Sequence, residues 1–299
     1  MRYSVIIPVY NRPDEVDELL QSLTRQSFKD FEVIVVEDGS SIPCKPVTEK
    51  YQELLDVHYY DKPNSGPGQT RNYGAERSKG EYLIILDSDC ILPEGYFLAV
   101  EEELQHEAAD AFGGPDRAHE SFTDIQKAIN YSMTSFFTTG GIRGGKKKMD
   151  KFYPRSFNMG VRREVYQALG GFSRMRFGED IDFSIRIFKG GYTCRLFPGA
   201  WVYHKRRTDF RKFFKQVHNS GIARINLYKK YPESLKLVHL LPAAFTLGVA
   251  IFLLGTPFCP YSLLPIALYA LLVCMDSTIR NRSLCLLYTS DAADDLIGV

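Results

Sequence analysis

Paired cysteines and a surplus of charge are both missing from this sequence. Its six cysteines are scattered and form no CxxC pair, which argues against a metal–thiolate site or a disulfide framework and favours a reducing compartment. The formal net charge of +1 gives no reason to expect a polyanionic partner such as nucleic acid. The apolar run at the N-terminus is too short for a signal peptide and is typical of a buried strand.

The first third of the sequence alternates between strand-like and helix-like segments. Apolar runs at Tyr3–Ile7, Phe31–Val36 and Glu81–Leu86 have the length of buried strands, whereas Asp14–Arg25 and Gly68–Ser78 have helical spacing. Short strands that are apolar throughout and alternate with helices are typical of a mostly parallel sheet with helices on both faces. We therefore predict a Rossmann-like α/β fold, in which ligands bind beyond the carboxyl ends of the strands.

The pattern changes from about Pro115 onward. The sequence predicts a helix over Asp124–Phe137, a glycine- and lysine-rich loop over Thr138–Asp150 and a short strand over Trp201–His204. A basic, amphipathic helix is expected over Asp209–Tyr228.

Two apolar runs without formal charge, Leu237–Gly255 and Phe258–Met275, follow that helix. Each is close to the roughly 20 residues that cross a bilayer as a helix, although the second is short enough to be re-entrant. Positive residues flank both outer ends, which places these ends in the cytoplasm: Lys229, Lys230, Lys236, Arg280 and Arg282. The alternative is a buried helical hairpin in a soluble domain. The acidic tail over residues 283–299 continues no pattern, and we suspect that it is not the natural end of the protein.

Acidic residues follow two of the predicted strands. Asp87-Ser88-Asp89 comes directly after the run that ends at Leu86, and two carboxylates so placed can converge on a divalent cation that also binds substrate phosphates. Glu37 and Asp38 follow the second strand and could accept hydrogen bonds from a base or a ribose. A solvated turn and a glycine-containing turn are the alternatives for these two clusters.

Three further features carry chemistry. A glycine turn enters a helix at Gly66–Asn72, where backbone N–H groups favour phosphate and Arg71 adds charge. Asp180, at a helix start, is a candidate general base for an acceptor hydroxyl, and His204 is a candidate ligand for Mn²⁺. The alternatives are a plain loop-to-helix junction, helix capping and a structural histidine.

The order of these motifs resembles that of the family 2 inverting glycosyltransferases, which have a GT-A-type fold. The resemblance covers roughly Arg2 to Tyr228. It is carried by Ser4–Asn11, Val35–Ser40, Arg71-Asn72, Asp87–Asp89, Asn158–Val161 with Gly170–Phe172, and Gly178–Asp180.

The resemblance implies a role for each matching residue. It implies that Asp180 is the catalytic base and that Glu179 orients the sugar or the acceptor. It implies that the nucleotide sugar is bound by Pro8, Tyr10, Asn11, Glu37, Asp38, Arg71, Asn72, Asp87 and Ser88, with Asp38 reading the base. It implies that Mn²⁺ or Mg²⁺ is bound by Asp89, Asp87 and His204, and the acceptor by Asn158, Gly171 and Phe172.

Some positions depart from the family pattern. Glu37 stands where a second Asp is common, and Cys90 stands where a small residue is common; we assign Cys90 no role. The Q-x-x-R-W motif of processive members is absent from Lys215–Gly221, which favours transfer of a single sugar.

We therefore expect a GT-A-type catalytic domain over residues 1–230 and a membrane-associated helical hairpin over residues 235–276. The expected donor is a nucleoside-diphosphate sugar, with UDP favoured, and the expected acceptor is a membrane-linked glycan or lipid at the cytoplasmic face of the inner membrane. The alternatives are an inactive nucleotide-sugar-binding scaffold and a nucleotidyltransferase. Two basic clusters could meet an anionic acceptor or lipid: Lys146, Lys147 and Lys148, and Arg206, Arg207, Arg211, Lys212 and Lys215.

Overall fold

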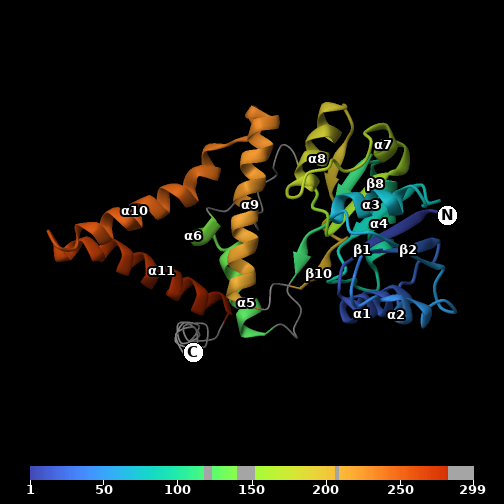
Figure 1. The fold of residues 1–299 in the computed structure, drawn as a ribbon, viewed down its shortest axis with the longest axis horizontal. Coiled ribbons are helices and arrows are strands. Elements are labelled where there is room, and N and C mark those ends of the chain that lie inside the picture. The colour runs from blue at the N-terminus through green and yellow to red at the C-terminus, as the bar shows by residue number, and fades with distance from the viewer. Residues whose placement is uncertain (118–122, 140–151, 206–208, 282–299) are drawn as a thin grey trace. The chain divides into compact units, whose positions relative to one another are not determined.

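The computed structural model describes residues 1–117, 123–139, 152–205 and 209–281 (Figure 1). The chain divides into two compact units, of which the first comprises Met1–His119 with Met149–Lys205 and the second comprises Glu120–Lys148 with Arg206–Val299. The lysines at 146–148, Arg206, Arg207 and the tail over 283–299 lie outside the described residues.

A seven-stranded sheet in the order β3-β2-β1-β4-β8-β6-β9 forms the centre of the first unit. Its first four strands are parallel: β1 (Tyr3–Val9), β2 (Phe31–Asp38), β3 (Val57–Lys62) and β4 (Tyr82–Leu86). The strand β8 (Asn158–Arg162) runs antiparallel to β4 and to β6 (Ala111–Gly113), and β9 (Cys194–Leu196) is parallel to β6. The prediction of a mostly parallel α/β sheet is therefore confirmed.

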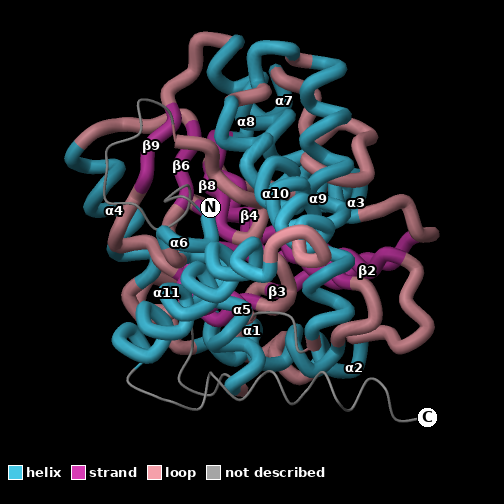
Figure 2. Tube along the Cα trace, turned by 90° about the vertical axis from the view of Figure 1, so that its left-hand side faces the viewer, coloured by secondary structure: helices cyan, strands magenta, loops and turns pink. Residues whose placement is uncertain are grey.

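Helices cover both faces of this sheet. Alternate side chains of β1 explain the two layers, because Val5 and Ile7 join the core under α1 and α4, whereas Ile6 joins the core under α3, α7 and α8. Figure 2 shows α1 and α2 on one side of the strands and α7 and α8 on the other. The helices are α1 (Pro13–Thr24), α2 (Lys45–Glu49), α3 (Pro67–Ala75), α4 (Tyr96–His106), α7 (Arg163–Ala168) and α8 (Glu179–Lys189).

A second, three-stranded sheet has the order β5-β10-β7. Its strands are β5 (Cys90–Ile91), β7 (Asp116–Arg117) and β10 (Val202–His204). His204 pairs in register with Cys90 across the antiparallel β5 and β10. This pairing brings a histidine from late in the chain beside Asp89, which immediately precedes β5.

The second unit is helical where it is described. Its helices are α5 (Asp124–Thr134), α6 (Phe136–Thr139), α9 (Phe210–Lys230), α10 (Leu241–Gly255) and α11 (Leu264–Asn281), with short 3₁₀ turns at Pro232–Ser234, Leu237–Leu240 and Pro260–Leu263. A stretch of 19 residues, Tyr261–Ile279, is long and apolar enough to cross a membrane, with a mean hydropathy of 1.8.

The two apolar runs differ in length from the sequence prediction. The first becomes the shorter helix, α10, because Leu237–Leu240 forms a 3₁₀ turn before Pro242 opens the helix. The second continues past Met275 to Asn281 as α11. Its Asp276 carboxylate accepts hydrogen bonds from the Tyr131 hydroxyl at 2.7 Å and the Ser135 hydroxyl at 2.9 Å.

Candidate active site

A buried arginine links two of the predicted acidic positions. Arg71 on α3 is only 3% exposed. Its Nη2 donates to Asp87 Oδ1 at 2.7 Å, just beyond β4, and its Nη1 donates to Glu179 Oε1 at 3.0 Å, at the start of α8. Burial raises the pKa of Glu179 although the charge of Arg71 opposes the shift. The structure thus joins Asp87, Arg71 and Glu179 into one continuous chain of charged contacts.

Asp180, the expected base, is the residue next to Glu179. Its Oδ2 accepts a hydrogen bond from Nε of Arg155 at 2.7 Å, and its Oδ1 accepts one from the Ile181 amide at 2.8 Å. Gly178 precedes the helix with a φ of 83°, a left-handed conformation that suits glycine and turns the chain into α8. Both acidic side chains therefore lie in the first turn of α8, where the positive end of the helix dipole favours negative charge.

The predicted acceptor residues Gly171 and Phe172 are held by Asn72. The Asn72 amide donates to the Phe172 carbonyl at 2.8 Å, and its Oδ1 accepts from the Phe172 amide at 2.8 Å and from the Tyr166 hydroxyl at 2.6 Å. Gly171 has a φ of +64°, and a Cβ at this position would lie 2.4 Å from Asn72 Oδ1. Asn72 therefore fixes the turn that follows α7, and its contact with the nucleotide stays a prediction.

Asp89 and His204 converge at the edge of the small sheet. Asp89 Oδ1 lies 3.2 Å from His204 Nε2, and the imidazole stacks on Phe157 with ring centroids 4.6 Å apart. Neighbouring ligands of an octahedral ion, each about 2.1 Å from the metal, lie about 3.0 Å apart. This pair therefore fits a divalent cation. Asp87 is not among the side chains that meet there, because its carboxylate pairs with Arg71.

Two other side chains border this pair. Arg12 Nη1 contacts Asp89 Oδ2 at 2.9 Å and partly balances its charge. Cys90 lies close enough to be a third ligand, but its thiol donates to the Phe157 carbonyl at 3.3 Å. Burial raises the pKa of Cys90 well above its ordinary value, which disfavours the thiolate. Oxygen and imidazole ligands without thiolate suit Mn²⁺ or Mg²⁺ better than a soft metal.

The Asp38 carboxylate, at the end of β2, finds its hydrogen-bond partners within the protein. Asp38 accepts hydrogen bonds from the amides of Ser65 at 2.9 Å and Gly66 at 3.0 Å, and it also pairs with Lys62. Burial alone would raise the pKa of Asp38, but the hydrogen bonds from Lys62 and Ser65 outweigh it and lower the pKa. Asp38 therefore shapes the turn that leads from β3 into α3 at Gly66.

Glu37 and Asn11 organise the loop after β2. Glu37 accepts hydrogen bonds from the Cys44 amide at 2.7 Å and from the Ser40 hydroxyl. Asn11 has a φ of 54°, and its Oδ1 accepts from the amides of Ser41 at 2.8 Å and Ile42 at 3.0 Å. The two side chains fasten this loop beside the end of β1, where Tyr10 is exposed.

The remaining predicted residues are spread over the same sheet. Pro8 is half-buried in β1, and Ser88 is buried between Asp87 and Asp89. Asn158 is enclosed, because its Oδ1 accepts from the Tyr96 hydroxyl at 2.6 Å and its Nδ2 donates to the Ala200 carbonyl at 2.7 Å. The structure places Asn158 in the core.

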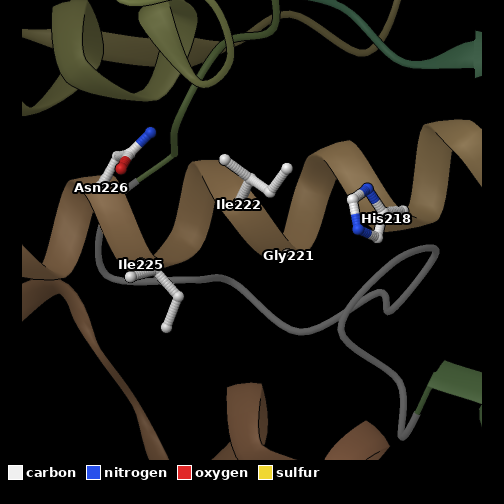
Figure 3. A pocket seen from close by; sticks show the side chains of 5 residues that line it. All are labelled: His218, Gly221, Ile222, Ile225 and Asn226. Carbon is white, nitrogen blue, oxygen red and sulfur yellow. The ribbon is translucent and has the colours of Figure 1, made fainter.

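Sequence reasoning missed three basic partners of these acids: Arg12, Lys62 and Arg155. Only Arg12 directly follows a quoted motif, Ser4–Asn11, so its position alone could have been suspected. A hollow of about 430 Å³ lies elsewhere, along successive turns of α9 in the second unit (Figure 3). It shares none of the residues above and is lined by His218, Gly221, Ile222, Ile225 and Asn226.

Comparison with known proteins identifies the family of the chain. The sequence model described as "Glycosyl transferase family 2" matches residues 4–170. An uncharacterized glycosyltransferase of Haemophilus influenzae is 30% identical over 193 residues, covering 62% of this chain and 62% of the relative. The poly(ribitol-phosphate) beta-N-acetylglucosaminyltransferase TarS of Staphylococcus aureus is 39% identical over 93 residues, covering 30% of this chain and 16% of TarS. The chain thus spans less than two thirds of the length of these relatives.

Solved structures share the fold. The mannosyltransferase PcManGT from Pyrobaculum calidifontis, in complex with GDP-Man and Mn²⁺, superposes with a TM-score of 0.60 and 18% identity over 98% of this chain and 86% of that one. TarS 1-349 of S. aureus in complex with UDP-GlcNAc superposes with a TM-score of 0.55 and 20% identity over 77% of this chain and 73% of that one. The fold and its acidic edge define a GT-A-type α/β protein. The chain belongs to glycosyl transferase family 2.

Proposed function

We propose that this protein transfers one sugar from a nucleoside-diphosphate sugar, with UDP favoured, to a membrane-linked glycan or lipid. Family membership and the nucleotide sugars bound in TarS and PcManGT support the class of donor. The observation that carries the proposal is the chain of contacts from Asp87 through Arg71 to Glu179, with Asp180 next to it. It connects Asp87, the residue after β4, to Glu179, the first residue of α8, which Asp180 follows directly.

In this proposal Asp180 is the general base. It takes the proton of an acceptor hydroxyl while the hydroxyl oxygen bonds to the anomeric carbon. The bond from that carbon to the diphosphate breaks on the opposite side, so the configuration inverts and nucleoside diphosphate leaves. In this structure Arg155 is paired with the Asp180 carboxylate. The acceptor hydroxyl would replace Arg155 as the partner of this carboxylate. Glu179, fixed by Arg71, orients the sugar or the acceptor.

Asp89 and His204 would hold Mn²⁺ or Mg²⁺, which when bound neutralises the diphosphate leaving group. The ring of Phe157 keeps the imidazole in place, and Arg12 holds the other carboxylate oxygen of Asp89. These two contacts preorganise the pair, so that little rearrangement is needed when the ion and the donor arrive.

Membrane association is part of the proposal. The apolar stretch Tyr261–Ile279 supports it, as does an exposed apolar row on α9 that includes Phe214, Val217 and Ile225. Basic side chains on the same helix favour an anionic lipid surface: Arg211, Lys212, Lys215, Lys229 and Lys230. We place the enzyme at the cytoplasmic face of the cell membrane. The lack of Q-x-x-R-W in Lys215–Gly221 favours transfer of a single sugar.

An Asp180→Asn variant tests the proposed base. With Mn²⁺ and a panel of nucleotide sugars, the wild type should release nucleoside diphosphate slowly by transfer to water. The variant should lose at least about 100-fold in rate, since a positioned base contributes roughly 10²–10⁴-fold, yet bind nucleotide as tightly as the wild type. Glu164→Gln, which alters an exposed carboxylate on α7, is the matched control and should keep full activity.

Two results would contradict the proposal. An Asp180→Asn variant with unchanged turnover would remove the base assignment. A wild-type protein that binds a nucleotide sugar tightly but never releases nucleoside diphosphate would instead be an inactive scaffold.

A further inference from the structure

A buried glutamate lies at the amino-terminal edge of the sheet, at the opposite end of β2 from Asp38. Glu32 is 0% exposed. Its Oε1 accepts hydrogen bonds from the Ser4 hydroxyl at 2.6 Å and from the Lys79 amide at 2.6 Å. Its Oε2 is also buried but has no hydrogen-bond partner among the described residues. A buried carboxylate oxygen without a partner is costly, so something else must compensate it.

The residues that face this oxygen come from the start of β3. His58 Nε2 lies 3.7 Å from Glu32 Oε2 and 3.1 Å from Asp56 Oδ1. This Nε2 atom is buried too and, within the described chain, makes no hydrogen bond. Three potential ligand atoms therefore surround one point, and two of them lack a hydrogen-bond partner.

The backbone holds these three residues firmly. β2 and β3 are parallel neighbours in register, with Val33 opposite Val57 and Ile34 opposite His58. The Val33 amide donates to the Asp56 carbonyl at 2.8 Å, which ties the residue before β3 to β2. The positions of the side chains consequently follow from the sheet itself.

We propose that Glu32, Asp56 and His58 bind a transition-metal ion of the zinc class. In a tetrahedral zinc site with bonds of about 2.0–2.1 Å, neighbouring ligand atoms lie about 3.4 Å apart. The observed 3.1 Å and 3.7 Å bracket that value, and all three ligand atoms lie within 4.8 Å of one another. One imidazole and two carboxylates form a donor set for zinc, and half-exposed Asp56 leaves the fourth position open to water.

The metal would compensate the charge of Glu32 and fasten the edge strand β3 to the sheet. At 3.7 Å, His58 Nε2 is too far from Glu32 Oε2 for a hydrogen bond, so the described side chains leave this buried oxygen without one. The site is independent of the proposed sugar transfer, because Glu32 and Asp38 lie at opposite ends of the same strand.

Zinc binding to the full-length, metal-free protein tests the inference. His204→Ala is introduced first, so that the Asp89 pair makes no contribution. Titration calorimetry with ZnCl₂ should show one more bound zinc per chain in this background than after the further change His58→Ala. Zinc should also raise Tm in the first protein and lose this effect in the second. His106→Ala, a change at the end of α4, is the control and should lose nothing.

Cobalt supplies a second measurement. Co²⁺ in the His204→Ala protein should show the visible absorption of tetrahedral coordination, and His58→Ala should remove it. Glu32→Gln should weaken zinc binding even where it leaves the far-ultraviolet circular dichroism unchanged. Equal zinc stoichiometry with and without His58 would overturn the inference. Absence of zinc binding in the His204→Ala background would also overturn it and leave Glu32, Asp56 and His58 as an ion-pair cluster only.

Discussion

Replacing Arg71 with methionine removes the guanidinium that joins Asp87 to Glu179. Methionine is unbranched and apolar but shorter than arginine, so the substitution also removes the guanidinium carbon that lies 5.3 Å from the centroid of the Phe172 ring. Two carboxylates then lose their shared partner. The Arg71→Met variant therefore measures how much the buried contacts stabilise the fold.

The structure sets the size of this effect. The side chain of Glu179 is 10% exposed and that of Asp87 is 33% exposed. Removing one partner of a buried ion pair costs about 3–5 kcal/mol. Solvent screens Asp87, so its share is at most about 1 kcal/mol. We therefore expect Arg71→Met to lower the free energy of unfolding by about 3 kcal/mol at pH 7, mostly through Glu179.

The loss should depend on pH in a defined direction. Burial raises the pKa of Glu179, and the charge of Arg71 opposes that shift, so the pKa rises further in the variant. A carboxyl whose folded pKa is raised destabilises the fold above that pKa and ceases to do so as the pH falls towards its unfolded value of about 4.3. The difference between variant and wild type should therefore shrink as the pH falls from 7 to about 4.5.

Urea unfolding followed by the fluorescence of Trp201 provides the assay, because Trp201 is the only tryptophan and lies in the first unit. Arg25→Met, the same change at an exposed position, is the control and should cost less than about 0.5 kcal/mol. Adding Glu179→Gln to Arg71→Met should recover at least about 1.5 kcal/mol. A loss below about 1 kcal/mol for Arg71→Met, or one that does not change with pH, would refute the reasoning.

Three further predictions concern Gly171, Asp38 and α11. Gly171→Ala should lower the free energy of unfolding by about 2–4 kcal/mol, because φ is +64° and the new Cβ meets Asn72. The control is Gly191→Ala, where φ is +78° but the space around the new Cβ is open. This control should cost only about 1 kcal/mol in the same urea titration. The lowered pKa of Asp38 stabilises the fold above the unfolded pKa of about 4, and this contribution is lost as the pH falls through the folded pKa. An Asp38→Asn variant should therefore lose less stability at pH 3 than at pH 7, and an equal loss at both values would argue against the contact with Lys62. Leu271→Lys, in the exposed apolar stretch of α11, should shift the protein from the membrane pellet to the supernatant, and a fully membrane-bound variant would argue against membrane association through α11.

Three of the four parallel strands, β1, β2 and β4, were predictable, because they coincide with the short, apolar runs at Tyr3–Ile7, Phe31–Val36 and Glu81–Leu86. The antiparallel strand β8 was not predictable as such, since its direction depends on pairing with β4 more than 70 residues earlier in the chain. The start of α10 was predicted too early, because hydropathy does not distinguish a 3₁₀ turn from an α-helix. Pro242 does mark the boundary between the two.

The candidate site was predictable in its acids but not in their partners. Asp89 could be selected as a candidate because it follows a predicted strand, and Asp180 because it lies at a predicted helix start. Arg155 could not be inferred, because no local pattern tells which carboxylate a distant arginine will meet. Asn72 was assigned to the nucleotide from a resemblance alone, whereas its contacts with Phe172 depend on tertiary structure.

The most direct test of the donor site is the affinity for UDP with and without Mn²⁺, measured by titration calorimetry on the wild type and on Asp89→Ala. Asp89 is the carboxylate that meets His204, so the wild type should bind UDP at least about tenfold more tightly with Mn²⁺ than without it. The Asp89→Ala variant should lose this difference. Equal enhancement by Mn²⁺ in both proteins, or no binding of UDP or any other nucleoside diphosphate to the wild type, would contradict the account.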